Sequence, residues 1–275
     1  MELTAAQLGL FGIGILVGAY GTLIGAGGGF VLVPILLFLY PSATPETITA
    51  ISLTTVFANA TSGSIAYARM RRVDFVSGGI FALATVPGAI AGVLTTAHMP
   101  RHLFDGILGV LMLGACGFLL VHPTCGPDAG ATNRRHRLTR QMVEADGTPH
   151  SFSYNPATGI TLSVFVGYLS SLLGIGGGII HVPALTHLLH FPVHIATATS
   201  HFVLAVMALV GSLVHLVRGD ITNVLGQVIP LALGVVVGAQ VGARLSTRLH
   251  GRWIVRGLGV ALGLVGVRLV WTVMN

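Results

Sequence analysis

Two glycine clusters carry the backbone chemistry of this chain. Both lie inside apolar runs, where a backbone amide without a hydrogen-bond partner costs several kcal/mol. The first cluster contributes Gly25, Gly27, Gly28 and Gly29, and the second contributes Gly174, Gly176, Gly177 and Gly178. Each cluster is therefore expected to interrupt a helix and to face protein or a wet cavity; the interruptions are called the first and the second break.

A helix that starts directly after each break would give the breaks a preference for anions. Helices starting at Gly29 and Gly178 would point free N–H groups and positive dipole ends at the breaks. A phosphate-binding loop is excluded, because no Lys-Ser/Thr pair follows either cluster. The alternative is that the glycines serve only tight helix packing or a sharp hairpin.

Hydroxyl side chains recur at matching positions after the two breaks. Thr49 and Ser52 are three residues apart, as are Thr197 and Ser200, so each pair shares one helix face. These hydroxyls could donate to the oxygens of an anion without a permanent charge. The alternative is that they bond their own backbone or a neighbouring helix.

Acidic residues are confined to loops and segment ends. We predict that Asp74, Asp105 and Asp220 begin helices as caps. The absence of a carboxylate within the predicted spans favours an anion over a cation as the ligand.

Histidines are concentrated in the second half of the chain. Six of the twelve lie in one stretch: His181, His187, His190, His194, His201 and His215. His201 follows Ser200 in a predicted span, where an ionisable group is a functional candidate, and it is expected to border the anion and couple transport to protons. A metal site at His187, His190 and His194 is disfavoured, because Pro192 interrupts the helix and no acidic partner is near. Neither a metal nor a cofactor is expected.

Composition identifies an integral membrane protein. Hydrophobic residues make up 53% of the 275 positions and charged residues 8%, whereas soluble domains have about a quarter charged. The net charge of +6 would suggest nucleic acid for a soluble chain, but Arg-rich cytoplasmic loops explain it here. The expected partners are a small anion and membrane lipid, with no nucleic acid; a homodimer is an open alternative.

Apolar segments predict an all-α polytopic membrane protein with five segments in each half. Six segments approach the roughly 20 residues of a span: Thr47 to Ala68, Val76 to Ala97, Leu103 to Val121, His194 to Val217, Val224 to Leu245 and Trp253 to Val273. Four shorter segments flank the breaks: Leu8 to Ile24, Phe30 to Tyr40, Thr158 to Leu173 and Ile179 to His190.

The two halves are a duplication. Small and polar residues of the first half recur in order 148 to 150 positions later, including the Gly88/Gly92 pair as Gly238/Gly242, which we interpret as helix packing. The predicted organisation is a first transmembrane repeat at 1–122, a cytoplasmic connector at 123–156 and a second repeat at 157–275. Within the connector, His150 to Tyr154 could pair as a short strand.

The distribution of arginine predicts that the second repeat is inverted. Clusters at Arg69 to Arg72, Arg134 to Arg140 and Arg244 to Arg256 fall on one face of the membrane if each half crosses it an odd number of times. That count holds if the two short segments at a break both span or form a re-entrant hairpin. It fails if they form one broken span.

The glycine motifs resemble those of a known family. The runs Leu23-Ile24-Gly25-Ala26-Gly27-Gly28-Gly29-Phe30-Val31-Leu32-Val33-Pro34 and Leu172-Leu173-Gly174-Ile175-Gly176-Gly177-Gly178-Ile179-Ile180-His181-Val182-Pro183, with the Thr-Ala-x-Ser segments that follow, are similar to the TauE/SafE sulfite exporters, also called the 4-toluene sulfonate uptake permease family. The resemblance implies a transporter of sulfite, thiosulfate or organosulfonates in the inner membrane of a bacterium or archaeon.

These observations favour a secondary transporter, not an enzyme. The anion is expected near the membrane midplane between the paired breaks, where transporters built from inverted repeats bind their substrates. A passive anion channel and a His-rich metal-dependent membrane protein are the alternatives.

Overall fold

A computed structural model describes residues 5–121, 138–246 and 262–271, which are mainly helical. The helices are α1 (Ala5–Ile24), α2 (Gly29–Leu39), α3 (Pro45–Arg69), α4 (Phe75–Thr96), α5 (Arg101–Val121), α6 (Pro156–Leu173), α7 (Gly178–His187), α8 (Val193–Val217), the 3-10 turn η1 (Thr222–Val224), α9 (Leu225–Leu245) and a last helix over Leu262–Trp271. Within the described ranges, five helices are long and apolar enough to cross a membrane. The all-α polytopic fold is therefore confirmed.

The predicted apolar segments coincide with these helices to within a few residues. The predicted span Trp253 to Val273 is described only over Leu262–Trp271, which is helical. The rest of that span lies outside the described residues, as do the arginines Arg134, Arg135, Arg137, Arg248, Arg252 and Arg256.

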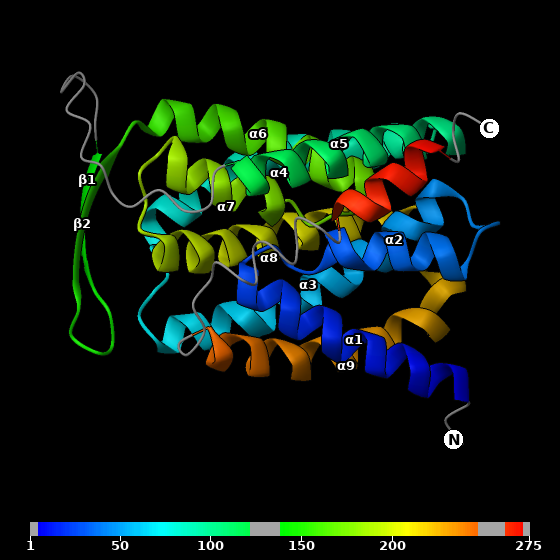
Figure 1. The fold of residues 1–275 in the computed structure, drawn as a ribbon, viewed down its shortest axis with the longest axis horizontal. Helices are drawn as coiled ribbons and strands as arrows, with labels where there is room; N and C mark the ends of the chain where they lie inside the picture. Colours follow the sequence, from blue (N-terminus) through cyan, green and yellow to red (C-terminus); the bar gives the residue numbers. More distant parts are fainter. Residues whose placement is uncertain (1–4, 122–137, 247–261, 272–275) are drawn as a thin grey trace.

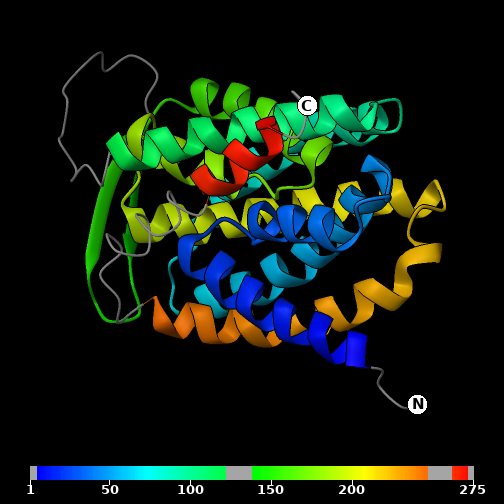
Figure 2. The same ribbon diagram turned by 45° about the vertical axis from the view of Figure 1, so that its right-hand side comes forward.

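Helices from the two halves of the chain are interleaved. The central helices α3 and α8 pack on each other, α1 packs on α9 at one side, and α4 packs on α6 at the other (Figures 1 and 2). A Cβ at Gly88 or Gly92 of α4 would collide with the α6 backbone, and one at Gly238 or Gly242 of α9 would collide with the α1 backbone. The packing interpretation of these glycine pairs is confirmed, and each pair joins one half to the other.

A β-hairpin covers one end of the helices, which we call the hairpin end; the opposite end is the far end (Figure 1). Strand β1 (Leu138–Val143) pairs antiparallel with β2 (Pro149–Tyr154). The prediction of a short strand at His150 to Tyr154 is confirmed.

Ion pairs and aromatic contacts attach the hairpin to both halves. Arg140 Nη2 lies 2.9 Å from Asp74 Oδ1, and this hydrogen bond raises the pKa of the guanidinium. Arg72 Nε lies 2.6 Å from Glu144 Oε2. On the side of the second half, the ring centroids of Phe152 and Phe191 lie 4.4 Å apart. The hairpin therefore bridges the α3–α4 loop and the α7–α8 loop.

The acidic residues predicted as caps behave differently from one another. Asp74 accepts hydrogen bonds from Val76 N and Ser77 N at the start of α4, so its cap is confirmed. The prediction is wrong for Asp105, which lies inside α5 and pairs with Arg101 one turn earlier. It is also wrong for Asp220, which pairs with His215 and Arg218 before η1. In both cases a nearby cation competes successfully for the carboxylate.

The chain reverses at each break. Helix α1 runs parallel to α9 toward the hairpin end, with Gly14 against Gly234 and Ala19 against Gly242. The 11-residue α2, about 16 Å long, then returns to the far end, where Arg101 donates to the carbonyl of Ala43. In the second half α6 runs parallel to α4 toward the far end, and α7 returns to the hairpin end. Neither break is a kink within one continuing span.

Candidate functional site

The two breaks have the same backbone conformation. The φ angles are 81°, 74° and 81° at Gly25, Gly27 and Gly28, and 69°, 79° and 68° at Gly174, Gly176 and Gly177. These left-handed values favour glycine. Helices α2 and α7 begin at Gly29 and Gly178, as predicted.

The breaks pack on each other through their fourth glycines. A Cβ at Gly29 would lie 2.6 Å from the carbonyl carbon of Ile175, and a Cβ at Gly178 would collide with the backbone of Ala26. These two glycines are therefore needed for the close approach of the two breaks. This agrees with the alternative that the glycines serve tight packing. The other three in each break are explained by their positive φ.

Several buried amides of the breaks have no backbone acceptor among the described residues. The N–H groups of Gly25 and Ala26 bond to carbonyls at the end of α1, and that of Ile175 bonds to Ser170 O. Within the described part of the chain, no acceptor is found for the N–H groups of four other buried residues: Gly27, Gly28, Gly176 and Gly177. Buried N–H groups are nearly always paired, and donors at a helix N-terminus suit an anion.

Two aliphatic side chains cover the place where the breaks meet. Val56 of α3 packs on both breaks, with methyl carbons 3.3 Å and 3.0 Å from Cβ positions built at Gly27 and Gly176. Leu204 of α8 lies 2.6 Å from the Gly27 position. Residues 25–30 and 174–179 are all buried, so a ligand reaches this site only if helices move.

The first predicted hydroxyl pair contacts the second break. Thr49 and Ser52 both lie against Gly174, 3.1 Å and 3.4 Å from its Cβ position. Ser52 Oγ donates to Gly174 O at 2.6 Å, and Thr49 Oγ1 lies 2.9 Å from Pro45 O. Both hydroxyls already have protein acceptors.

Of the second predicted pair, Thr197 contacts the first break. Thr197 Cγ2 lies 2.5 Å from the Cβ position of Gly25. Ser200, on the same helix face, is fully buried, and its Oγ has no partner among the described residues. Ser200 therefore differs from Thr49 and Ser52, whose hydroxyls have protein acceptors.

His201 belongs to a polar network beside the first break. Its Nε2 lies 3.3 Å from Thr22 Oγ1, which donates to Asn59 Oδ1. Asn59 Nδ2 donates to Gly27 O at 3.0 Å, and Tyr67 OH donates to Thr22 O at 2.7 Å. No role was predicted for Thr22 or Tyr67, although a polar side chain within an apolar span was the signal that pointed to His201.

The structure brings no metal site together in the part of the chain that it describes. No three His, Cys, Asp or Glu residues converge there. His181 of α7 is buried near Ser163 of α6, whereas His215 lies in the last turn of α8 beside Asp220.

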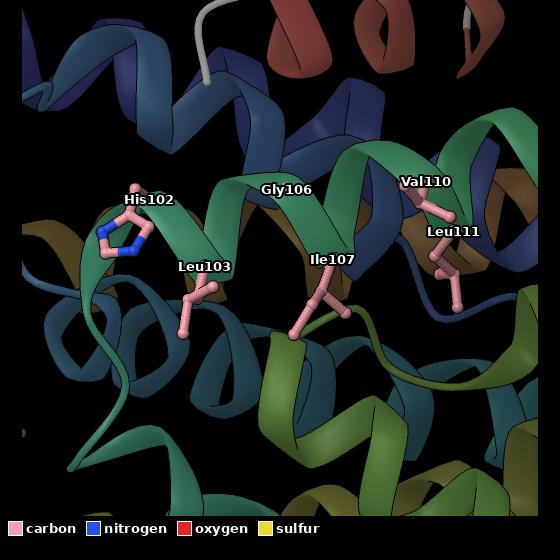
Figure 3. Close-up of a pocket in the computed structure, with 6 residues that line it drawn as sticks. All are labelled: His102, Leu103, Gly106, Ile107, Val110 and Leu111. Carbon is pink, nitrogen blue, oxygen red and sulfur yellow. The ribbon is translucent and has the colours of Figure 1, made fainter. Parts of the chain in front are cut away.

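A separate groove runs along the outer face of α5 (Figure 3). Its lining is apolar except for one histidine: His102, Leu103, Gly106, Ile107, Val110 and Leu111. It contains none of the predicted site residues, and its apolar lining suits lipid rather than an anion.

Comparisons with known proteins agree with the motif resemblance. The sulfite exporter TauE/SafE family matches residues 10–269. The probable membrane transporter protein YunE of Bacillus subtilis is 32% identical over 76% of this chain and 78% of its own length. The probable membrane transporter protein MJ0441 of Methanocaldococcus jannaschii is 26% identical over 80% and 78% of the two chains. No solved structure matches. The chain is a multi-pass membrane transporter that belongs to the TauE/SafE sulfite exporter family.

Proposed function

We propose that the protein is a secondary transporter of a sulfur-containing anion such as sulfite, thiosulfate or an organosulfonate, bound between the two breaks. The observation that carries this proposal is the set of unpaired, buried N–H groups at Gly27, Gly28, Gly176 and Gly177, located where α2 and α7 begin. The Ser200 hydroxyl adds a further donor. These groups offer hydrogen bonds and helix-dipole ends without a fixed positive charge, which suits a weakly held, mobile anion.

We infer that the two repeats, 1–122 and 157–275, are inverted in the membrane. Each half contains a helical hairpin at its break, followed in the first half by three longer helices. Helix α1 starts at the far end and α6 at the hairpin end, while α2 and α7 point to opposite ends (Figure 1). This arrangement supports an odd number of crossings per half and a site near the midplane.

We further infer that the hairpin end is cytoplasmic. Arg69, Arg71, Arg72 and Arg140 lie there, as does Arg244 in the last turn of α9. Arginine enrichment marks the cytoplasmic side of the inner membrane in bacteria and archaea. The connector, 123–156, would then be cytoplasmic.

Substrate uptake by purified protein in proteoliposomes tests the function. Sulfite, thiosulfate, sulfoacetate and taurine are supplied separately, with sulfate as the comparison anion. A saturable, counterflow-competent uptake of one sulfur anion is expected. Fast, unsaturable flux with a reversal potential set by the anion gradient would instead identify a channel.

Substitution of Ser200 tests the location of the site more sharply than substitution of the glycines. A valine at Gly28 would be strained at φ 81° and would collide with Val17, so lost transport there could reflect misfolding. Ser200→Ala is expected to raise KM by about tenfold, the equivalent of one hydrogen bond to a charged group. Ser212→Ala removes another buried, unpaired hydroxyl of α8 and should leave KM unchanged. Equal KM values in Ser200→Ala and the wild type would contradict the site.

A further inference from the structure

We propose that His215 is the proton-binding residue that couples transport, and that it exchanges protons with water at the far end through Asp220. This inference rests on the proposed anion site, because it connects the proton to the second break. It assigns coupling to a different residue from His201.

His215 connects a partly exposed carboxylate to a buried hydroxyl. Its side chain is fully buried in the last turn of α8, whereas the Asp220 side chain is 20% exposed. His215 Nδ1 lies 2.8 Å from Asp220 Oδ2, and Nε2 lies 3.3 Å from Thr49 Oγ1. The imidazole therefore spans the distance from far-end solvent to α3.

Thr49 carries this connection to the second break. Its Cα lies 3.1 Å from the Cβ position of Gly174. One turn later Ser52 Oγ bonds the carbonyl of the same glycine at 2.6 Å. A shift of this turn of α3 would therefore move the backbone that supports Gly176 and Gly177.

Both protonation states of His215 satisfy all the groups in this chain of contacts. In one neutral tautomer, Nδ1–H donates to Asp220 and Nε2 accepts from the Thr49 hydroxyl. In the other tautomer and in the imidazolium, Nε2–H donates to Thr49 Oγ1, and the Thr49 hydroxyl donates instead to Pro45 O at 2.9 Å or Glu46 O at 3.1 Å. The Asp220 carboxylate takes a proton from far-end water and passes it to Nδ1 of this second tautomer, so the imidazolium forms and the carboxylate is again ionised. Loss of the Nε2 proton reverses the direction of the hydrogen bond between His215 and Thr49, so the ring is a two-state element.

Charged groups from two segments act on the ring. Burial of the ring opposes the imidazolium most strongly, and Arg218, 3.2 Å from Asp220, also opposes it, whereas Asp220 after α8 and Glu46 of α3 favour it. A protonated His215 adds positive charge beside the second break, which strengthens anion binding there. The proton and the anion therefore bind cooperatively, as in symport.

The first half lacks this route. The residue equivalent to His215 is Tyr67, whose hydroxyl donates to Thr22 O and does not titrate near neutral pH. The equivalent of Asp220 is Asp74, which is fully buried and held by Arg140. His201 is fully buried beside Thr22, and no carboxylate among the described residues bonds to it. Within the described ranges, a partly exposed carboxylate is joined to a buried histidine only at His215.

Thiosulfate uptake in proteoliposomes at several pH values tests the proposal, because thiosulfate remains a dianion over the range of about pH 5 to 8 in which histidine titrates. With equal pH on both sides, the wild-type KM is expected to fall by about fivefold or more from the alkaline to the acidic limit. His215→Gln should show a KM that is independent of pH and should not accumulate thiosulfate when only a proton gradient is applied. His102→Gln, an exposed far-end histidine, is the matched control and should behave as the wild type.

Asp220→Asn keeps the size of the side chain and should also flatten the pH response, so the proposal stays testable if His215→Gln is poorly folded. Retention of the pH response in His215→Gln and Asp220→Asn, its loss in His201→Gln instead, or a pH-independent wild-type KM would each overturn the role of His215. A wild-type protein that transports none of the sulfur anions would overturn the proposed function itself, and the coupling with it.

Discussion

The hydroxyl of Ser52 donates a 2.6 Å hydrogen bond to the carbonyl oxygen of Gly174 and so joins α3 to the second break. The equivalent residue of the second half, Ser200, is equally buried, but its hydroxyl has no partner among the described residues. The hydroxyl at this position thus has a structural role in the first half, whereas the equivalent hydroxyl of the second half bonds none of the described residues.

Ser52→Ala should destabilise the protein, because the buried Gly174 carbonyl loses its donor. The expected cost is about 1 to 3 kcal/mol, measured as a lower Tm in detergent. Ser200→Ala removes a hydroxyl without a protein partner and should leave the Tm unchanged. Equal losses of Tm in the two variants would contradict the distinction drawn between them.

Gly29→Ala and Gly178→Ala should each force the two breaks apart. A methyl group at either position would collide with backbone of the opposite break, and overpacking of this kind costs about 1 to 3 kcal/mol. Gly79→Ala is the control, because the space around its Cβ position is open. Thermal unfolding of the three variants compares them; a wild-type Tm for Gly29→Ala would mean that the breaks are not in contact.

Asn59→Ala should disturb the first break without touching the second. The change removes the donor to Gly27 O and the acceptor of Thr22 Oγ1, at an expected cost of about 1 to 3 kcal/mol. We expect a lower Tm together with slower uptake of the transported anion. Thr54→Ala, whose hydroxyl bonds only the carbonyl of Ala50 in its own helix, should change neither property.

Arg140→Gln should loosen the hairpin. The guanidinium forms two hydrogen bonds with the fully buried Asp74 carboxylate, and loss of one partner leaves that charge unpaired. Amide hydrogen exchange over β1 and β2 should become faster than in the wild type. The control Arg69→Gln changes an exposed arginine at the same end; if it accelerates exchange equally, the effect is one of net charge rather than of the Arg140–Asp74 pair.

Patterns along the chain were sufficient for the helices and the breaks. Apolar length located the helices to within a few residues, and glycine runs located the two breaks and the starts of α2 and α7. These features depend on local properties: the hydrophobicity of about 20 consecutive residues and the tolerance of glycine for positive φ.

The cap and hydroxyl predictions depended on partners that are distant in the sequence or that compete locally. Asp105 and Asp220 were predicted as caps. The Asp105 carboxylate instead pairs with Arg101, and the Asp220 carboxylate pairs with His215 and Arg218. The Thr49 and Ser52 hydroxyls were predicted ligand donors, yet they bond protein acceptors, and the acceptor of Ser52 lies 122 residues away. Pattern alone does not show which partner occupies a polar group.

The sequence by itself determined that this is a mainly helical membrane protein with a glycine break in each half, because hydrophobic length and glycine content are properties of consecutive residues. Only the tertiary structure decided that the chain reverses at each break, that Gly29 packs on Ile175 and that His215 meets both Asp220 and Thr49. The physical reason is that these relationships are contacts between separate helices, and they are set by how the helices pack rather than by the properties of any one segment.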